Sequence, residues 1–234
     1  MSEFSRTTLL IGEEKLKKLK NSHIAVFGLG GVGSYVVEAL ARCGVGRITI
    51  VDHDIVSQSN INRQLIALHS TIGRKKTDVV RERIIDINPE CVVTAFDEFY
   101  CADNSDKIFC ERYDYVVDAI DSVESKLDLI KRCKDNGIPI ICSMGTGNKL
   151  NPRMFEVADI YKTQVCPLCR SMRSRLRKMG IQELKVVYSK EEPIQYRKEL
   201  DSQTSKPVIS SISFVPSVAG LIIAENVVKD IIEG

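Results

Sequence analysis

Short apolar runs alternate with helix-like stretches over the first two thirds of the chain. Five of the runs predict β-strands, at residues 23–27, 47–51, 91–95, 113–117 and 138–142. The stretches between them place apolar residues at helical spacing and predict helices over 32–42, 75–87 and 122–135. Such alternation is typical of βαβ units with parallel strands. The pattern predicts an α/β fold: a Rossmann-like, mostly parallel sheet with helices on both faces.

The pattern weakens after residue 147. It predicts, in order, a strand at 154–157, a basic helix at 168–179, a strand at 184–188 and a last helix at 216–232. We expect this part to form a smaller C-terminal α+β elaboration. The chain is therefore divided into an N-terminal helical arm (1–22), a Rossmann-like domain (23–147) and the elaboration (148–234).

Composition narrows the class of protein. With 234 residues, 44% hydrophobic and 27% charged, the chain can bury a core, and global disorder is excluded. The net charge of +2 does not by itself indicate nucleic acid, although a local basic patch can still bind it. Residues 1–22 lack the apolar segment of a signal peptide, and the longest apolar stretch, 212–224, is interrupted by polar residues and proline. We expect a cytoplasmic protein with reduced cysteines and no membrane contact.

A glycine-rich turn follows the first strand and opens a helix, which is the context that gives a G-x-G-x-x-G pattern meaning. Its glycines are Gly28, Gly30, Gly31 and Gly33. The free N–H groups and partial positive charge of a helix start bind phosphate. Asp52 lies 24 positions after Gly28, near the spacing of an acidic residue that binds ribose. An adenine nucleotide is predicted, with NAD and ATP both open at this point.

The stretch after Asp52 favours ATP. Asn60 can donate an amide to a phosphate oxygen, and Arg63 can clamp one with two hydrogen bonds. Lys76 adds a further positive charge at the start of the next helix. A dehydrogenase needs no such set, whereas a reacting triphosphate does. The alternative is that Arg63 and Lys76 are solvated surface charges.

Two aspartates follow the fourth strand. An acidic group here must bind a cation or accept hydrogen bonds, because its burial is otherwise unfavourable. Asp121 is predicted to bind Mg²⁺ beside the triphosphate. Asp118 is expected to cap the following helix or to position the loop. Lys126 is expected either to reach the site or to be a plain surface lysine.

Taken together, these residues resemble the ThiF/MoeB/HesA superfamily, the bacterial relatives of ubiquitin-activating enzymes. The resemblance covers residues 6–147 and rests on Gly28-x-Gly-Gly-x-Gly33, Asp52-x-Asp54, Ser59-Asn60-x-Asn62-Arg63-Gln64, Gly73-x-x-Lys76 and Asp118-x-x-Asp121.

The resemblance implies an adenylylating enzyme that forms a homodimer and uses ATP and Mg²⁺. It assigns Asp52 to the ribose, and it implies that Arg6 reaches the triphosphate of the partner subunit. The expected nucleotide site comprises Gly28, Gly30, Gly31, Gly33, Asp52, Asp54, Asn60, Arg63 and Lys76. The expected catalytic residues are Arg6, Arg63, Lys76 and Asp121, the last also as the Mg²⁺ ligand. On this view residues 1–22 contact the dimer partner and ATP, 23–147 bind ATP, and 148–234 bind substrate and dimerise.

Within the superfamily, the chain is most similar to the tRNA threonylcarbamoyladenosine dehydratases. The likeness extends over almost the whole chain and includes Asn151-Pro152 and Ser213-Phe214-Val215-Pro216-Ser217. It implies ATP-dependent cyclisation of N6-threonylcarbamoyladenosine in the tRNA anticodon loop, through an acyl adenylate. The alternative is an adenylyltransferase acting on the C-terminal Gly-Gly of a ubiquitin-like sulfur carrier, and a sulfur-transfer partner protein stays open.

Two features of the C-terminal part bear on that choice. Cys166 and Cys169 form a single C-x-x-C pair, which departs from the dehydratase pattern; zinc, a redox pair and ordinary helix-start cysteines are the alternatives. The basic helix carries Arg170, Arg173, Arg175, Arg177 and Lys178, and we expect it to contact tRNA phosphates, with Lys149 and Arg153 as extensions. A solvated helix face is the other interpretation.

Overall fold

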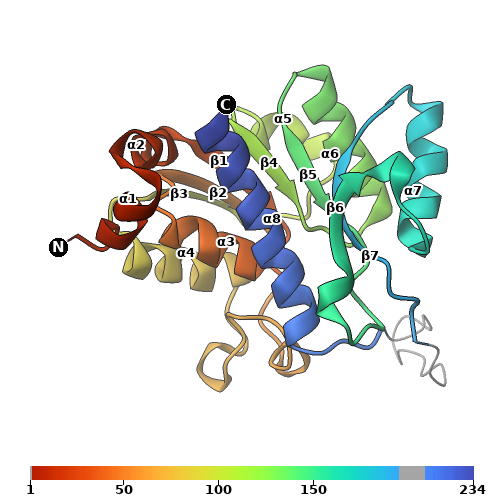
Figure 1. Cartoon of the computed structure of the whole chain (residues 1–234). Coiled ribbons are helices and arrows are strands. Elements are labelled where there is room, and N and C mark those ends of the chain that lie inside the picture. Colours follow the sequence, from red (N-terminus) through yellow and green to blue (C-terminus); the bar gives the residue numbers. More distant parts are fainter. Residues whose placement is uncertain (1, 195–208) are drawn as a thin grey trace.

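The computed structural model describes residues 2–194 and 209–234, and its centre is a single β-sheet (Figure 1). The strands are β1 (His23–Phe27), β2 (Arg47–Val51), β3 (Val92–Phe96), β4 (Tyr115–Asp118), β5 (Ile140–Ser143), β6 (Phe155–Asp159) and β7 (Lys185–Ser189). Their spatial order is β3-β2-β1-β4-β5-β7-β6. The five predicted N-terminal strands are all present and parallel. The two strands from the C-terminal part continue the same sheet: β7 pairs with β5 in parallel, and β6 is an antiparallel edge.

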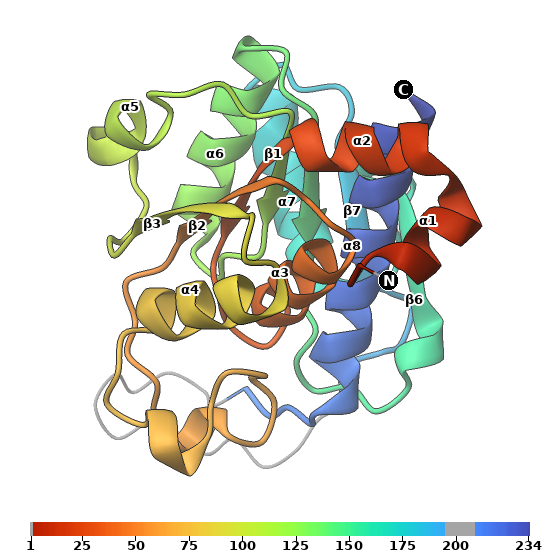
Figure 2. The same ribbon diagram turned by 90° about the vertical axis from the view of Figure 1, so that its left-hand side faces the viewer.

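Helices cover both faces of the sheet, as the alternating pattern predicts (Figures 1 and 2). They are α1 (Ser5–Ile11), α2 (Glu13–Asn21), α3 (Gly33–Arg42), α4 (Lys76–Ile87), α5 (Ser105–Ile108), α6 (Val123–Asp135), α7 (Pro167–Lys178) and α8 (Phe214–Glu233). Apolar residues of α3, α4 and α8 share one buried cluster with one set of strand residues. Those of α5, α6 and α7 share a second cluster with the residues that point the other way. The two clusters follow from alternation along the strands, since successive side chains point to opposite faces.

The predicted ends of these elements agree with the structure to within about two residues, as is usual for helix and strand boundaries. The fourth strand, for example, begins at Tyr115 rather than at residue 113. The helix predicted from residue 122 begins at Val123, because Ser122 is its N-cap and accepts a hydrogen bond from Ser125 N. No helix in the described residues is long and apolar enough to cross a bilayer.

The parallel strands all end at one edge of the sheet, which is where ligands bind in such folds. The first turn of α8 lies at this edge, while α2 leads into the start of β1 and therefore lies at the opposite one (Figure 1). Residues from distant parts of the sequence are thus brought together around the strand ends.

Candidate active site

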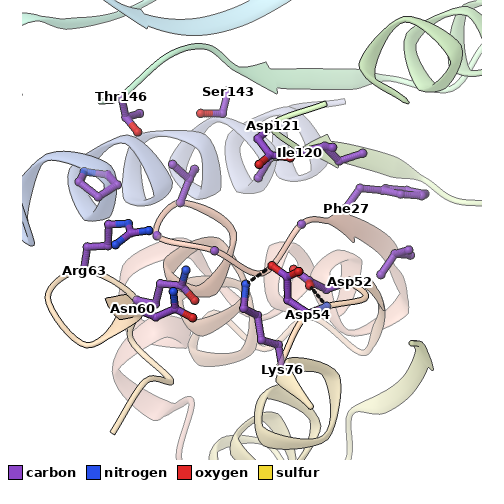
Figure 3. Close-up of a pocket in the computed structure, with 18 of the residues that line it drawn as sticks. Phe27, Asp52, Asp54, Asn60, Arg63, Lys76, Ile120, Asp121, Ser143 and Thr146 are labelled. Carbon is purple, nitrogen blue, oxygen red and sulfur yellow. Dashed lines mark hydrogen bonds and ion pairs between the residues drawn. The ribbon is translucent and has the colours of Figure 1, made fainter. Parts of the chain in front are cut away.

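A cavity of about 580 Å³ occupies this edge (Figure 3). Its walls come from the segments after β1, β2, β3, β4 and β5, and from the first turns of α7 and α8. Of the residues predicted to bind nucleotide or metal, Gly28, Gly30, Gly31, Asp52, Asp54, Asn60, Arg63, Lys76 and Asp121 line it. The fold therefore collects side chains from four separate sequence motifs around one space.

The glycines of the turn have different surroundings. Gly28 has φ +87°, and a Cβ there would lie 2.6 Å from Ala119 O, so both backbone conformation and packing require glycine. A Cβ at Gly33 would overlap Gly28 O, and Gly33 does not line the cavity. A Cβ added at Gly30 would have just one neighbour within 4 Å among the described residues, the end of the Gln64 side chain. Gly28 and Gly33 thus shape the turn, while Gly30 leaves its backbone open to a ligand.

Asp52 directly follows β2 and is buried, with 8% of its surface exposed. Its Oδ2 accepts from Leu29 N at 2.6 Å, and its Oδ1 accepts from Asp54 N at 2.8 Å. The carboxylate therefore ties the glycine-rich turn to the loop after β2. Each oxygen has a second lone pair, so a ribose hydroxyl can still donate to it.

Lys76 and Asp54 form an ion pair on the cavity wall. Lys76 Nζ lies 2.6 Å from Asp54 Oδ2, and the loop is fixed further by Lys76 N, which donates to Asp54 O (Figure 3). The lysine is 4% exposed at its side chain and the aspartate 50%. The alternative that Lys76 is a solvated surface charge is wrong.

Asn60 and Arg63 lie on the turn beyond β2, on the side of the cavity near Gly31 (Figure 3). Asn60 is 9% exposed, and its Oδ1 accepts from Ser57 N at 3.1 Å, which leaves the amide nitrogen to donate to a ligand. Arg63 is half-buried and donates through Nη1 to Ser59 O and Asn62 Oδ1, both at 2.9 Å. These bonds anchor one nitrogen of the guanidinium beside the cavity, where the remaining N–H groups can donate to a ligand.

The two aspartates after β4 differ sharply. Asp121 is exposed on the cavity wall and makes no hydrogen bond or ion pair with any described residue. Asp118 is fully buried, accepts from Ile120 N at 3.1 Å and pairs with Lys126 Nζ at 2.9 Å. Asp118 positions the loop, as one of its two predicted roles states, whereas the capping role belongs to Ser122. Both expectations for Lys126 are wrong, because it is 1% exposed and bound to Asp118 and Ser143 O.

Aromatic residues that we did not predict line the cavity after β3. Phe99 packs edge-on against His53, with ring centroids 5.0 Å apart. Tyr100 is buried, and its hydroxyl donates to Asp128 at 2.7 Å; burial and that aspartate raise the pKa of Tyr100. The only indication in the sequence is that these aromatics follow a strand, at the rim where the other strands end.

Most residues of the cavity wall opposite Arg63 and Lys76 were not predicted from the sequence either. This wall is formed by the loop after β5 and by single residues of more distant segments: Met144, Gly145, Thr146, Gly147, Leu168 and Ile209. These residues are weakly polar, in contrast to the charged wall that holds Arg63 and Lys76. The cavity therefore has a charged side and a nearly neutral side.

Arg6 does not line the cavity of its own chain. It lies exposed on α1, whose Leu9 and Leu10 are 87% and 85% exposed. Its predicted contact with a partner subunit stays a prediction.

The basic helix α7 is only partly available to a ligand. Arg173 turns inward and donates to Thr163 O at 3.1 Å, Arg175 pairs with Glu124, and Arg177 lies over the Tyr161 ring. Arg170 and Lys178 stay exposed with no such partner among the described residues.

Of the two extensions of this basic surface, Arg153 is exposed. Lys149 is not a surface residue: it is 4% exposed and donates to Glu191 O. Its expected place in a tRNA-contacting surface is therefore wrong.

The cysteines are all free thiols. Burial raises the pKa of Cys91 to about 11 and also raises that of Cys142, as expected of inert core residues. Within the described residues, only Asp52, His53 and Asp54 group closely enough to hold a metal ion. Cys166 and Cys169 therefore lack the further ligands that a zinc site needs.

Comparison with known proteins agrees with this architecture. The model of the ThiF family matches residues 4–233. The tRNA threonylcarbamoyladenosine dehydratase of Bacillus subtilis is 46% identical over an alignment of 243 positions, which covers 100% of this chain and 96% of that protein. The Vanderwaltozyma polyspora adenylyltransferase and sulfurtransferase UBA4 is 36% identical over only 59% of this chain and 31% of its own length.

Solved structures give the same picture. The Escherichia coli tRNA N6-threonylcarbamoyladenosine dehydratase TcdA, in complex with AMP, superimposes with a TM-score of 0.90 at 36% identity. The alignment covers 99% of this chain and 94% of that one. A second structure of the same enzyme, in complex with ATP, also gives a TM-score of 0.90. With its sheet order, strand-end cavity and sequence all in agreement, the chain belongs to the ThiF family.

Proposed function

We propose that this protein uses ATP to adenylylate the carboxylate of N6-threonylcarbamoyladenosine in the tRNA anticodon loop and then closes the ring. The observation that carries the proposal is the two-sided cavity. One wall brings together Asn60, Arg63, Lys76 and the open backbone at Gly30, and the other is the nearly neutral loop after β5. The full-length likeness to dehydratases, against the partial likeness to a carrier adenylyltransferase, favours the tRNA substrate.

The charged wall is suited to a triphosphate. The first turn of α3 offers N–H groups and a partial positive charge, and Gly30 has no side chain to keep a phosphate away. Asn60 donates its amide to a phosphate oxygen, while Arg63 and Lys76 neutralise charge that shifts toward pyrophosphate. Asp52 accepts from a ribose hydroxyl, and its two backbone bonds hold it in place for that contact.

The residues present also suit a magnesium ion. The Asp121 carboxylate is exposed on the cavity wall, with no partner in the described part of the chain. A carboxylate oxygen of this kind, together with phosphate oxygens, is the ligand set that Mg²⁺ prefers. When bound, the ion stabilises negative charge on the phosphates.

The reaction follows from this arrangement. The substrate carboxylate attacks the α-phosphate, pyrophosphate leaves, and an acyl adenylate forms. An amide nitrogen of the same substrate then attacks the acyl carbon and AMP departs. Because that step is intramolecular, orientation supplies much of the rate and no protein nucleophile is required. The loop of residues 144–147 is the wall against which the acyl group is held.

Two further parts of the proposal concern partners. Exposed Arg170 and Lys178 on α7, with Arg153, form the basic surface that contacts tRNA phosphates. The exposed Leu9 and Leu10 of α1 are buried in a homodimer, in which Arg6 reaches the partner's triphosphate.

The test is ATP consumption by the purified protein with three substrates: tRNA that carries threonylcarbamoyladenosine, unmodified tRNA and a ubiquitin-like carrier protein. AMP release is expected only with the modified tRNA. Release with the carrier alone would overturn the substrate assignment and leave adenylylation intact. Light scattering of the purified protein measures its mass, and a monomer would overturn the homodimer.

A further inference from the structure

Asn62 stands in the same motif as Asn60 and Arg63, yet none of the roles proposed above uses its side chain. The residue is exposed and does not line the cavity. Both ends of its amide are nevertheless bound. Oδ1 accepts from Arg63 Nη1 at 2.9 Å, and Nδ2 donates to Ser211 O at 3.0 Å. Fixing an exposed side chain at both ends costs conformational freedom, and the bonds replace bonds to water, so they contribute little to stability.

The first of these bonds decides which edge of the Arg63 guanidinium is free. Nη1 carries two hydrogens, and its bonds to Ser59 O and to Asn62 Oδ1 use both of them. Nε and Nη2 have no partner among the described residues. They share one edge of the planar group and form a fork that can bind two oxygens of a phosphate. Because Arg63 lines the cavity, the bond to Asn62 keeps this fork available to a ligand there.

The second bond fixes the amide of Asn62 itself. Its acceptor, Ser211 O, belongs to a segment that is anchored on both sides. Ser210 N and Oγ donate to Asn148 Oδ1 at 2.9 and 2.8 Å, and Asn148 N donates to Ser210 O at 2.9 Å. On the other side, Ile212 packs against the buried cluster that α3, α4 and α8 share. Because a carbonyl oxygen accepts only, Nδ2 must face it, and Oδ1 is thereby turned toward the guanidinium.

The alternative is that Asn62 only stabilises its own turn. That turn is already closed by its backbone, since Arg63 N and Gln64 N donate to Asn60 O at 3.1 and 2.9 Å. The residue type also favours an orienting role. A carboxylate here would accept from Arg63 but could not donate to Ser211 O, and its negative charge would oppose that of a phosphate. A neutral amide avoids both faults.

We propose that Asn62 is a positioning residue for the triphosphate, an inference that rests on the proposed use of ATP. Held by Ser211 O, its amide keeps the Arg63 guanidinium turned so that the fork of Nε and Nη2 meets the phosphates. Asn62 acts through Arg63 and touches neither ATP nor the substrate. It also links the phosphate site to the segment that contributes Ile209 to the opposite wall of the cavity.

The experiment is a double-mutant cycle on ATP binding, measured by calorimetry on the full chain in the presence of Mg²⁺. Asn62→Ala should weaken ATP binding about tenfold, the size of one hydrogen bond to a charged group. In an Arg63→Ala protein the same change should alter ATP binding less than about twofold, because no guanidinium is left to position. Adenosine binding and the melting temperature should stay unchanged in Asn62→Ala, whereas a purely structural role would change them.

Two further variants sharpen the cycle. Asn136→Ala is the matched control: it removes an exposed amide that donates to Arg132 O at the end of α6, and ATP binding should stay unchanged. Asn62→Asp keeps an acceptor for Arg63 but loses the donor to Ser211 O. It should therefore bind ATP no better than Asn62→Ala.

Normal ATP binding by Asn62→Ala would overturn the proposal, and so would an equal loss with and without Arg63. Normal binding by Asn62→Asp would overturn it too, because the bond to Ser211 O would then be unnecessary. The cycle needs no tRNA, so its failure leaves the proposed dehydratase activity standing. If the unsubstituted protein bound no ATP, the proposed function itself would be wrong.

Discussion

Two lysine–aspartate pairs lie near the same edge of the sheet, and they are built differently. Lys126 and Asp118 are 2.9 Å apart with side chains 1% and 0% exposed. Lys76 and Asp54 are 2.6 Å apart, but half of the Asp54 side chain is open to solvent. The first pair is sealed in the core and can only hold the fold together. The second has room to exchange its partner for a ligand, which is the property that a phosphate-binding lysine needs.

The glycine-rich turn shows the same division. Gly33 is closed in by the backbone at Gly28, whereas Gly30 faces open space. Within a few residues of the turn, one position has no space for a side chain and another has such space. Substitutions on the sealed side should change stability, and those on the open side should change activity.

The largest effect is expected at Arg63 on the open side. Arg63→Ala removes a guanidinium that stabilises charge leaving with pyrophosphate, so AMP formation should fall about a thousandfold. The melting temperature should stay unchanged, because among the described residues the guanidinium donates only to Ser59 O and Asn62 Oδ1 of its own turn. The matched control is Arg42→Ala on α3, an exposed arginine paired with Glu38. Near-normal turnover of Arg63→Ala would remove Arg63 from the site.

Next in size is Lys126→Met on the sealed side. It leaves the Asp118 charge buried without its partner, which costs about 3–5 kcal/mol in the free energy of unfolding. Urea denaturation measures this loss, and the double variant with Asp118→Asn should recover much of it. A stable Lys126→Met protein that had lost only its activity would reverse the assignment of this pair.

For Lys76→Met we expect about a hundredfold fall in AMP formation, because one preorganised charge is lost from the phosphate site. The free energy of unfolding should fall by about 1 kcal/mol or less, since Asp54 can be solvated in place of its lost partner. Parallel kinetics and urea denaturation give both values. A stability loss as large as that of Lys126→Met would show that the two pairs are equivalent.

The two glycines provide a smaller version of the same test. Gly33→Ala should reduce the free energy of unfolding by about 1–3 kcal/mol, because its Cβ would meet Gly28 O. Gly30→Ala should change stability by about 0.5 kcal/mol or less and weaken ATP binding, as measured by calorimetry. Equal stability losses in the two variants would contradict the division between them.

The smallest effect concerns pH and the sealed His23. The pKa of His23 is lowered below 6.5 in the folded protein. Burial is the main cause, and the positive charge of Arg47 is the second. The unfolded chain therefore binds a proton first as pH falls, and this contribution to stability is complete above pH 6.5 and declines below it. His23→Gln should flatten the decline between pH 6.5 and 5.5 in urea denaturation.

The strands and major helices were predictable because apolar periodicity and caps fix them locally. The position of the cavity followed as well, since parallel strands share one edge. What could not be predicted was burial: nothing in the spacing of Asp118 and Lys126 shows that they are sealed from solvent. Lys149 was wrongly predicted to be exposed for the same reason, because in the sequence a lysine near a basic helix resembles a surface residue.

The contribution of single residues from distant segments was equally hidden. Phe99 and Leu168 belong to no motif, and only the fold brings them to the same cavity as the glycine turn. Pairing of β7 with β5 could not be inferred either, since a five-residue strand carries no mark of its neighbour. A sequence shows which residue types stand in a motif. Which residues become their neighbours in space depends on how the whole chain packs.

The first turn of α8 has a consequence for how the enzyme is made. Pro216 lines the cavity, and its ring atoms lie 3.2 Å from where a Gly31 Cβ would be. The ribosome delivers the chain from its N-terminal end, so the glycine turn and its cations emerge long before this wall exists. A nascent chain therefore carries Asn60, Arg63 and Lys76 before α8 has been synthesised, and Pro216 joins the cavity wall only after that.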